Sequence, residues 1–378
     1  MNNVSNGGPK KPLPKAIPER IREAREARGF TPEEFAERLD VSRQAVAQFE
    51  TGQISPSGEV MAKIIGITAQ PPMFFVTPRE RARTGIPFWR SLKRMEQHHR
   101  RRIARRLEWA RDIAAYVDRF IELPNVNLPH VEFDVEFSSD EEIERAAEAL
   151  RDHWQLGRTR IRNLATVLEE NGIILVREAV ECPDMDAVSC WQGGRPFILC
   201  SAEVSSGPRS TYNLAHELGH VLLHAGVDIS SDNLSRIEKQ ANRFAGALLL
   251  PRETFSQEVL GTSVSYFESL KKRWGVAIAA MAYRCKDLKI FNENQFSYLM
   301  RQMNARRIRK VEPLDDAFPV EDPSLLAESL RMIVERGVQT REQIEAALSL
   351  NLSDVENICG VSKGYLDARI VAFVPRQR

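Results

Sequence analysis

The sequence predicts a mainly helical protein with a small β-sheet, an α+β fold divided into several domains. The chain has 378 residues, which is long enough for two or three domains. Apolar residues recur every three or four positions through much of it, as in amphipathic helices. Between residues 172 and 201, short runs with β-branched residues replace this spacing, and they predict the strands of one small sheet.

A five-helix domain with a helix-turn-helix is predicted at residues 16–78, after a polar N-terminus, residues 1–15, that we expect to be disordered. Thr31 and Glu34 can form a capping box with proline at the first helical position, so one helix begins there. Ser42 can cap the next helix, which ends at a glycine. Two short helices joined by a tight turn are typical of a helix-turn-helix.

The second of these helices begins with side chains suited to reading DNA bases. Ser42, Arg43 and Gln44 lie at its start, and Gln48 follows one turn later. A glutamine can make paired hydrogen bonds to adenine, and an arginine can do the same to guanine. At the N-terminal end of a recognition helix, such side chains face the major groove. These four residues are therefore the predicted DNA-binding residues.

The stretch from residue 21 to residue 67 resembles the XRE family of phage-repressor-like domains. The resemblance includes Phe-Glu-Thr-Gly at residues 49–52 and Ser-Pro-Ser at residues 55–57. It implies that the partner is double-stranded operator DNA. A helical module that binds only other proteins is the alternative.

Residues 79–139 are predicted to be a basic helical connector followed by a linker. Glu96 and Glu108 are the acidic residues among its basic ones, which are Arg90, Lys93, Arg94, Arg100, Arg101, Arg102, Arg105, Arg106 and Arg111. As a helix, this segment could brace a homodimer or touch DNA phosphates, although a charge run is more often a solvated face. Pro124 and Pro129 mark the linker.

The next domain, residues 140–312, begins with two predicted helices and continues into the sheet. Strands are expected at residues 172–177, 187–192 and 195–201. The last two should form a hairpin, because a Gly-Gly turn at 193–194 joins them. An exposed edge strand of such a sheet can pair with an extended peptide, which suggests a protein substrate.

The motif His216-Glu217-Leu218-Gly219-His220 carries the most specific chemistry in the chain. Four residues of helix place both imidazoles on one face with a rise of about 6 Å, so their nitrogens can converge on one tetrahedral ion. Glu217 projects about 100° round the helix from His216. There it can reach a metal-bound water without binding the metal. This is the H-E-x-x-H pattern of zinc peptidases.

Two residues compete for the role of third metal ligand. His224 lies about 12 Å along a straight helix from His216, too far for both to join His220 at one ion. We therefore expect His224 to be a core histidine or to support a ligand by hydrogen bonding. Glu238 borders the apolar stripe of a second predicted helix, and Asn242, one turn later, could hydrogen-bond a ligating histidine. Spacing alone equally allows Glu238 to be a solvated glutamate.

The stretch from residue 209 to residue 251 resembles the ImmA/IrrE family of zinc metallopeptidases, which implies a gluzincin-like fold for the domain. The shared residues are Leu214-Ala215-His216-Glu217-Leu218-Gly219-His220, Glu238, Ala241-Asn242, Phe244-Ala245 and Leu248-Leu249-Leu250-Pro251. The resemblance implies that His216, His220 and Glu238 bind Zn²⁺ and that Glu217 is the catalytic base. Gln240 departs from the pattern, because many relatives carry an acidic residue there.

Together the two resemblances imply a DNA-tethered zinc endopeptidase. Members of this peptidase family cleave XRE-type repressors and so switch on gene expression in stress responses or mobile-element induction. The alternative belongs to another class of protein. It is a transcription regulator or antitoxin whose peptidase-like domain senses a signal or binds a partner without cleaving it.

The remaining features are less specific. Helices are expected at residues 264–274 and 277–288. Residues 313–378 should form an acidic, proline-rich linker and a helical appendage, in which Thr340 and Gln343 can form a capping box. No apolar run approaches 18 residues, and the five cysteines form no C-x-x-C pair, so we expect a cytoplasmic protein with reduced thiols and no membrane span.

Overall fold

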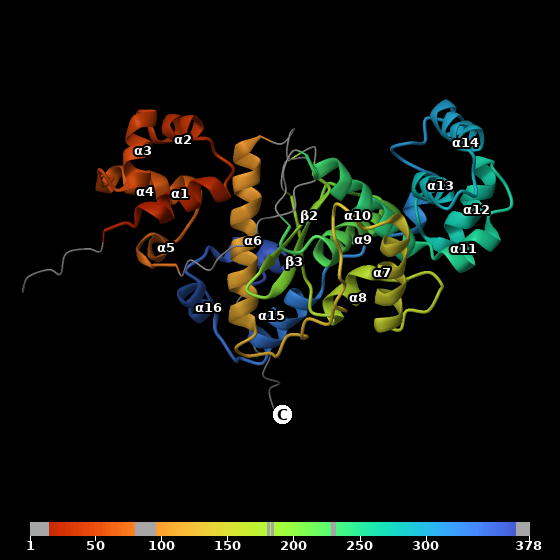
Figure 1. Cartoon of the computed structure of the whole chain (residues 1–378). Helices are drawn as coiled ribbons and strands as arrows, with labels where there is room; N and C mark the ends of the chain where they lie inside the picture. The colour runs from red at the N-terminus through yellow and green to blue at the C-terminus, as the bar shows by residue number, and fades with distance from the viewer. Residues whose placement is uncertain (1–14, 80–95, 180–181, 183–184, 228–231, 368–378) are drawn as a thin grey trace, which may run out of the picture.

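The computed structural model describes residues 15–79, 96–179, 182, 185–227 and 232–367. The expected N-terminal disorder, apart from Lys15, and the basic residues Arg90, Lys93 and Arg94 lie outside this part of the chain. The described residues form helices around one three-stranded sheet, which confirms the predicted mainly α fold with a small β-sheet (Figure 1).

The N-terminal helices form the predicted helix-turn-helix. They are α1 (Pro18–Ala27), α2 (Pro32–Leu39), α3 (Arg43–Thr51), α4 (Gly58–Thr68) and α5 (Pro72–Val76). Thr31 and Glu34 make the capping box of α2, and the Ser42 hydroxyl accepts a hydrogen bond from the Ala45 amide at the start of α3. The turn between α2 and α3 passes through Asp40, whose φ of 58° is left-handed. Both predicted caps are confirmed.

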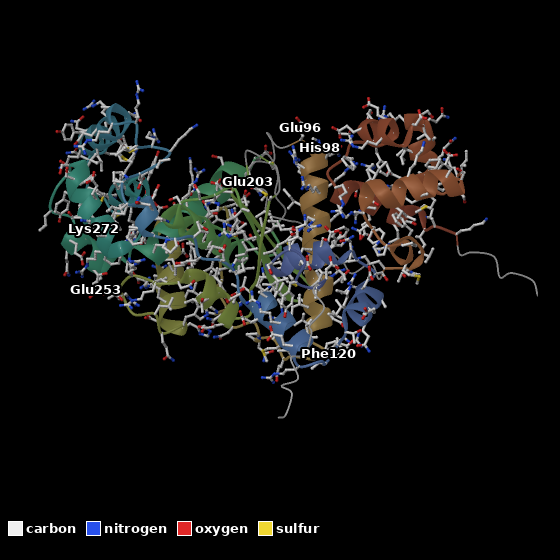
Figure 2. All side chains as sticks on the ribbon, turned by 180° about the vertical axis from the view of Figure 1, so that it is seen from behind. Glu96, His98, Phe120, Glu203, Glu253 and Lys272 are labelled. Carbon is white, nitrogen blue, oxygen red and sulfur yellow. The ribbon has the colours of Figure 1, made fainter. Side chains whose placement is uncertain are left out.

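The connector forms the long helix α6 (Gln97–Val117), which lies between the N-terminal helices and the sheet (Figure 1). Its 21 residues span about 31 Å, and Figure 2 shows His98 at one end and Phe120 just beyond the other. Its arginines bind acids of the same chain: Arg105 pairs with Glu26 and Glu108. These arginines, which the sequence left open as a solvated face or as phosphate contacts, are therefore partly engaged in ion pairs within the chain.

The sheet has the order β1-β3-β2, where β1 is Ile174–Glu178, β2 is Ala187–Gln192 and β3 is Arg195–Ser201. Strands β2 and β3 form the predicted antiparallel hairpin, and β1 pairs with β3 in parallel. Gly193 and Gly194 both have positive φ values, as a two-residue hairpin turn of type I′ requires. The predicted strands are confirmed to within two residues.

Two hydrophobic cores meet at this sheet, one on each face. Along each strand, every second side chain points to the same face of the sheet. On one face, side chains such as Val176 and Leu199 pack against the N-terminal helices, α6 and the C-terminal helices. Their strand neighbours, such as Leu175 and Ile198, pack with the remaining helices. Those helices are α7 (Asp140–His153), α8 (Leu164–Glu170), α9 (Gly207–Leu223), α10 (Leu234–Leu249), α11 (Arg252–Glu258), α12 (Val264–Trp274), α13 (Ile278–Asp287) and α14 (Glu293–Ala305). The two helices expected beyond residue 251 are confirmed as α12 and α13.

The C-terminal helices pack around α6 and β1. They are α15 (Leu325–Glu335), α16 (Arg341–Leu348) and α17 (Leu352–Cys359), preceded by a short 3₁₀ turn at Asp315–Ala317. The capping box of Thr340 and Gln343 is present at α16. Side chains of α17 belong to the same core as α1 and α6, so these helices join the N-terminal helices to the sheet. Among the described residues, no helix is both long and apolar enough to cross a membrane.

Candidate metal centre

The candidate site is built on α9, which packs closely against α10. Gly219 lies inside the H-E-x-x-H motif, and a Cβ there would meet the Phe244 ring at 3.1 Å and the Ala241 Cα at 3.3 Å. A side chain at this position would therefore require Phe244 or the α10 backbone to shift by a few tenths of an ångström. Because the helices approach closely here, a carboxylate on α10 can reach the imidazoles on α9.

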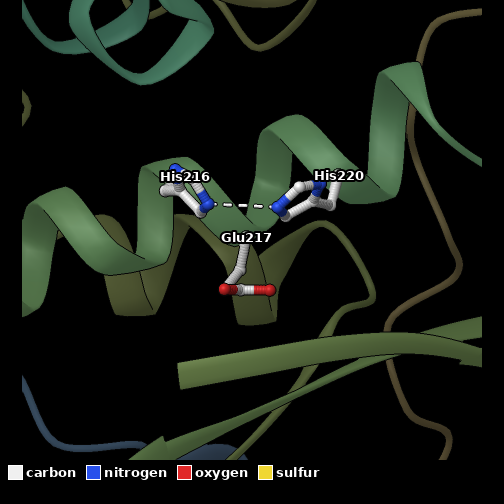
Figure 3. Close-up of side chains that lie close together, drawn as sticks. All are labelled: His216, Glu217 and His220. Atoms are coloured by element: carbon white, nitrogen blue, oxygen red, sulfur yellow. Dashed lines mark hydrogen bonds between the residues drawn. The ribbon is translucent and has the colours of Figure 1, made fainter. Parts of the chain in front are cut away.

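Two imidazoles and one carboxylate converge at this crossing. The Nε2 atoms of His216 and His220 lie 3.0 Å apart (Figure 3). Glu238 places one oxygen 3.5 Å from the His216 nitrogen and the other 3.4 Å from the His220 nitrogen. Donors at about 2.0–2.1 Å from a tetrahedral zinc ion lie about 3.3 Å from one another. The three side chains thus fit Zn²⁺ and would leave a fourth position for water or substrate.

The Glu238 carboxylate is held in the ionised form that a metal ligand needs. Burial alone would raise its pKa, but hydrogen bonding and electrostatic attraction from His216 and His220 outweigh burial and lower the pKa to about 2. The side chain is 18 % exposed, whereas both imidazoles are almost fully buried. The carboxylate therefore lies on the more open side of the cluster.

Glu217 lies beside this cluster and is also buried. One of its carboxylate oxygens lies within 4.8 Å of both imidazoles, so on proximity alone Glu217 could also be a ligand. We favour Glu238 for that role, because it places one oxygen near each imidazole nitrogen, whereas the Glu217 carboxylate is bound by Ser189. Figure 3 shows the Glu217 carboxylate pointing from α9 toward the strands. That position suits a base acting on a water in the fourth metal position.

Ser189 is a residue of the site that the sequence did not indicate. It lies on β2, is fully buried, and its hydroxyl donates a 2.7 Å hydrogen bond to the Glu217 carboxylate. The contact fixes the carboxylate against the sheet. No motif marks this serine, and only the pairing of β2 with α9 brings it to the site.

Asn242 lies where it can orient His216. Its side-chain oxygen is 3.2 Å from Nδ1 of His216, while its amide nitrogen donates to the backbone carbonyl of Glu238 at 2.8 Å. The hydroxyl of Tyr212 lies 3.3 Å from the same side-chain oxygen. With Asn242 as acceptor, Nδ1 of His216 carries the proton and Nε2 is left to bind a metal.

His224 lies outside the three-residue cluster, in contact with His220. Their Nδ1 atoms are 3.0 Å apart, and Nε2 of His224 lies 3.1 Å from the side-chain oxygen of Gln240. Burial, together with the nearby His220, lowers the pKa of His224 to about 3, so this imidazole is neutral. It can therefore support His220 by hydrogen bonding.

Three of the four predicted DNA-binding residues lie at the start of α3, and Gln48 follows one turn later. Ser42, Arg43 and Gln44 are exposed, and Gln48 is partly buried. Arg43 forms an exposed ion pair with Glu33 at 2.7 Å, which a DNA base could displace. Ser42 also caps the helix, so it has a structural role whether or not it touches DNA.

Comparison with known families agrees with this organisation. Residues 168–286 match the peptidase family described as the IrrE N-terminal-like domain, and residues 21–68 match a helix-turn-helix family. No curated protein matches the chain. The first match contains His216, Glu217, His220 and Glu238, and the second contains the whole of α3. Both expected resemblances are confirmed, and they support a DNA-binding regulator with a peptidase-like domain.

Proposed function

We propose that this chain, a DNA-binding regulator with an IrrE-like peptidase domain, is a zinc endopeptidase that cleaves a repressor-type transcription factor and so switches on gene expression, for example in a stress response. One observation carries the proposal. His216, His220 and Glu238 converge within 3.0–3.5 Å of one another, and the Glu217 carboxylate lies beside them. Two imidazoles, one carboxylate and an adjacent base are the parts that peptide hydrolysis by a zinc enzyme requires.

Each residue has a distinct part in the reaction. When bound by the three ligands, zinc supplies a Lewis acid that acidifies water and polarises the scissile carbonyl. Glu217 accepts the proton of the attacking water and passes it to the leaving amine. Ser189 holds the Glu217 carboxylate in place for both transfers, through its 2.7 Å hydrogen bond.

The position of an edge strand beside the proposed base favours a peptide as the substrate. Among the described strands, β2 is at an edge, and it lies against α9 through the contact between Ser189 and Glu217. An extended peptide that adds to this edge would gain backbone hydrogen bonds and pass close to the base. A repressor chain with an exposed extended segment would meet this requirement.

The helix-turn-helix supplies a means of finding the substrate. The exposed start of α3 is proposed to read an operator in double-stranded DNA. A repressor bound to the same operator would then be held close to the peptidase. All five cysteines are buried thiols outside any disulfide, which is consistent with the cytoplasmic setting that we propose for this reaction.

The test is cleavage of an XRE-type repressor that shares the operator, using zinc-loaded protein and the Glu217→Gln variant. We expect the wild type to cut the repressor and the variant to keep zinc but lose cleavage, because glutamine cannot accept the proton. Undiminished cleavage by the variant would refute the assigned base. Operator release on zinc removal, without cleavage and without an effect of Glu217→Gln, would instead support a non-cleaving sensor.

A further inference from the structure

Behind His220, a line of buried polar side chains runs from the candidate metal site to the backbone. Nδ1 of His220 meets Nδ1 of His224 at 3.0 Å, and Nε2 of His224 meets the Gln240 side-chain oxygen at 3.1 Å. The amide nitrogen of Gln240 then donates to the backbone carbonyl of Val135 at 3.0 Å. His220, His224 and Gln240 are each at most 6 % exposed, so these contacts do not compete with bulk water.

With a metal ion on Nε2 of His220, one arrangement of protons satisfies every contact in this line. A backbone carbonyl can only accept, so the amide group of Gln240 must face Val135 and its oxygen must face His224. Nε2 of His224 must then carry a proton, and Nδ1 of His224 accepts from His220, because an imidazole that binds a metal through Nε2 keeps its own proton on Nδ1. The proton between the two imidazoles therefore belongs to Nδ1 of His220. That leaves Nε2 of His220 as an unprotonated nitrogen facing His216 and Glu238.

We propose that His224 and Gln240 form a directed hydrogen-bond relay, anchored on the Val135 carbonyl, that fixes His220 in its metal-binding tautomer and so raises the zinc affinity of the site. Both are positioning residues, since they act through His220. The inference rests on the zinc centre of the proposed function, but it does not depend on cleavage of any substrate.

The relay complements the contact made by Asn242. His216 is held directly by the side-chain oxygen of Asn242, whereas His220 is held by the oxygen of Gln240 through a second imidazole. Val135 belongs to a turn that precedes α7, so the anchor lies outside the α9–α10 pair. This gives Gln240 a reason to be an amide: a carboxylate could accept from His224 but could not donate to Val135.

The test is zinc affinity, measured by competition with a chromophoric zinc chelator on the full-length chain. We expect Gln240→Leu and His224→Leu to bind zinc about 10- to 100-fold more weakly than the wild type, which is the usual effect of removing such supporting contacts. His224→Asn should recover much of the loss, because its side-chain oxygen can accept from Nδ1 of His220. Gln192→Leu is the matched control, since Gln192 is a buried glutamine on β2 that donates a hydrogen bond to Cys190.

Two outcomes would overturn the relay. One is a Gln240→Leu variant that binds zinc as tightly as the wild type. The other is an equal loss in His224→Asn and His224→Leu, which would mean that His224 only fills space. Selective ¹⁵N-histidine NMR of the zinc-bound wild type should also show the protons on Nδ1 of His220 and Nε2 of His224. A wild type that binds zinc with the relay intact but cleaves no repressor would contradict the proposed peptidase function alone.

Discussion

Arg106 of α6 and Asp354 of α17 form a buried ion pair with a 2.7 Å contact, although 248 residues separate them in the chain. Asp354 also accepts hydrogen bonds from Arg28, the C-cap of α1, and from Gln70 after α4. Arg106 binds Glu178 at the end of β1 as well. One buried polar network therefore connects the helix-turn-helix, the connector helix, the C-terminal helices and the sheet that carries Ser189.

Removing the Asp354 carboxylate should destabilise the whole assembly. Asp354→Asn leaves Arg28 and Arg106 without a shared anion, and breaking a buried pair in this way costs about 3–5 kcal/mol. We expect the free energy of unfolding to fall by about this amount in urea titrations. Asp367→Asn is the matched control, because its pair with Arg341 is about half exposed and should change stability by less than about 1 kcal/mol. Equal effects of the two substitutions would contradict this account of the network.

The same carboxylate predicts how stability depends on pH. Burial alone would raise the pKa of Asp354, but Arg106 and Arg28 outweigh it and lower the pKa below the ordinary 3.8. A group with a lowered folded pKa stabilises the protein fully above its unfolded pKa and loses that effect as the pH falls through the folded value. The stability difference between wild type and Asp354→Asn should therefore stay constant from about pH 5 to pH 8 and shrink below about pH 4. A difference that grows on acidification would contradict the sign of this shift.

The Ser189 hydroxyl is expected to assist Glu217 without holding the metal. Ser189→Ala removes a hydrogen bond to a charged group, which is worth about 1.5–3 kcal/mol. If the bond orients the base, kcat for repressor cleavage should fall roughly 10- to 100-fold with zinc content unchanged. Ser189→Thr, which keeps the hydroxyl, should retain more activity than the alanine variant. Loss of zinc from Ser189→Ala would mean that the serine acts on the metal ligands instead.

The predicted base contacts of α3 lead to a test on DNA. Gln44→Ala should weaken binding to the specific operator by about 1–3 kcal/mol, because a paired contact to one base is lost, and should leave non-specific binding little changed. Gln257→Ala, an exposed glutamine on α11 at the far end of the molecule, is the control. Affinities are compared at one fixed salt concentration. If both variants bind the operator like the wild type, Gln44 does not read a base.

The sequence predicted those features that depend on local patterns. The caps at Thr31 and Ser42 follow from hydrogen bonds within one turn, and the hairpin follows from its two glycines, so both could be read from short stretches. Ser189, Gln240 and Asp354 could not be assigned roles in this way. Each acts through a residue on another element, and the meeting of those elements depends on helix crossing and strand register.

Zinc content of the purified protein tests the central claim most directly. We expect about one zinc ion per chain in the wild type and in Glu217→Gln, and less than about a tenth of that in His216→Ala and Glu238→Gln, because a site of this kind binds tightly only with its three ligands intact. Folding of each variant is checked by circular dichroism. If Glu238→Gln retains zinc and Glu217→Gln loses it, the assigned roles of the two glutamates are reversed. If the wild type holds less than about a tenth of a zinc ion per chain, the zinc centre itself is contradicted.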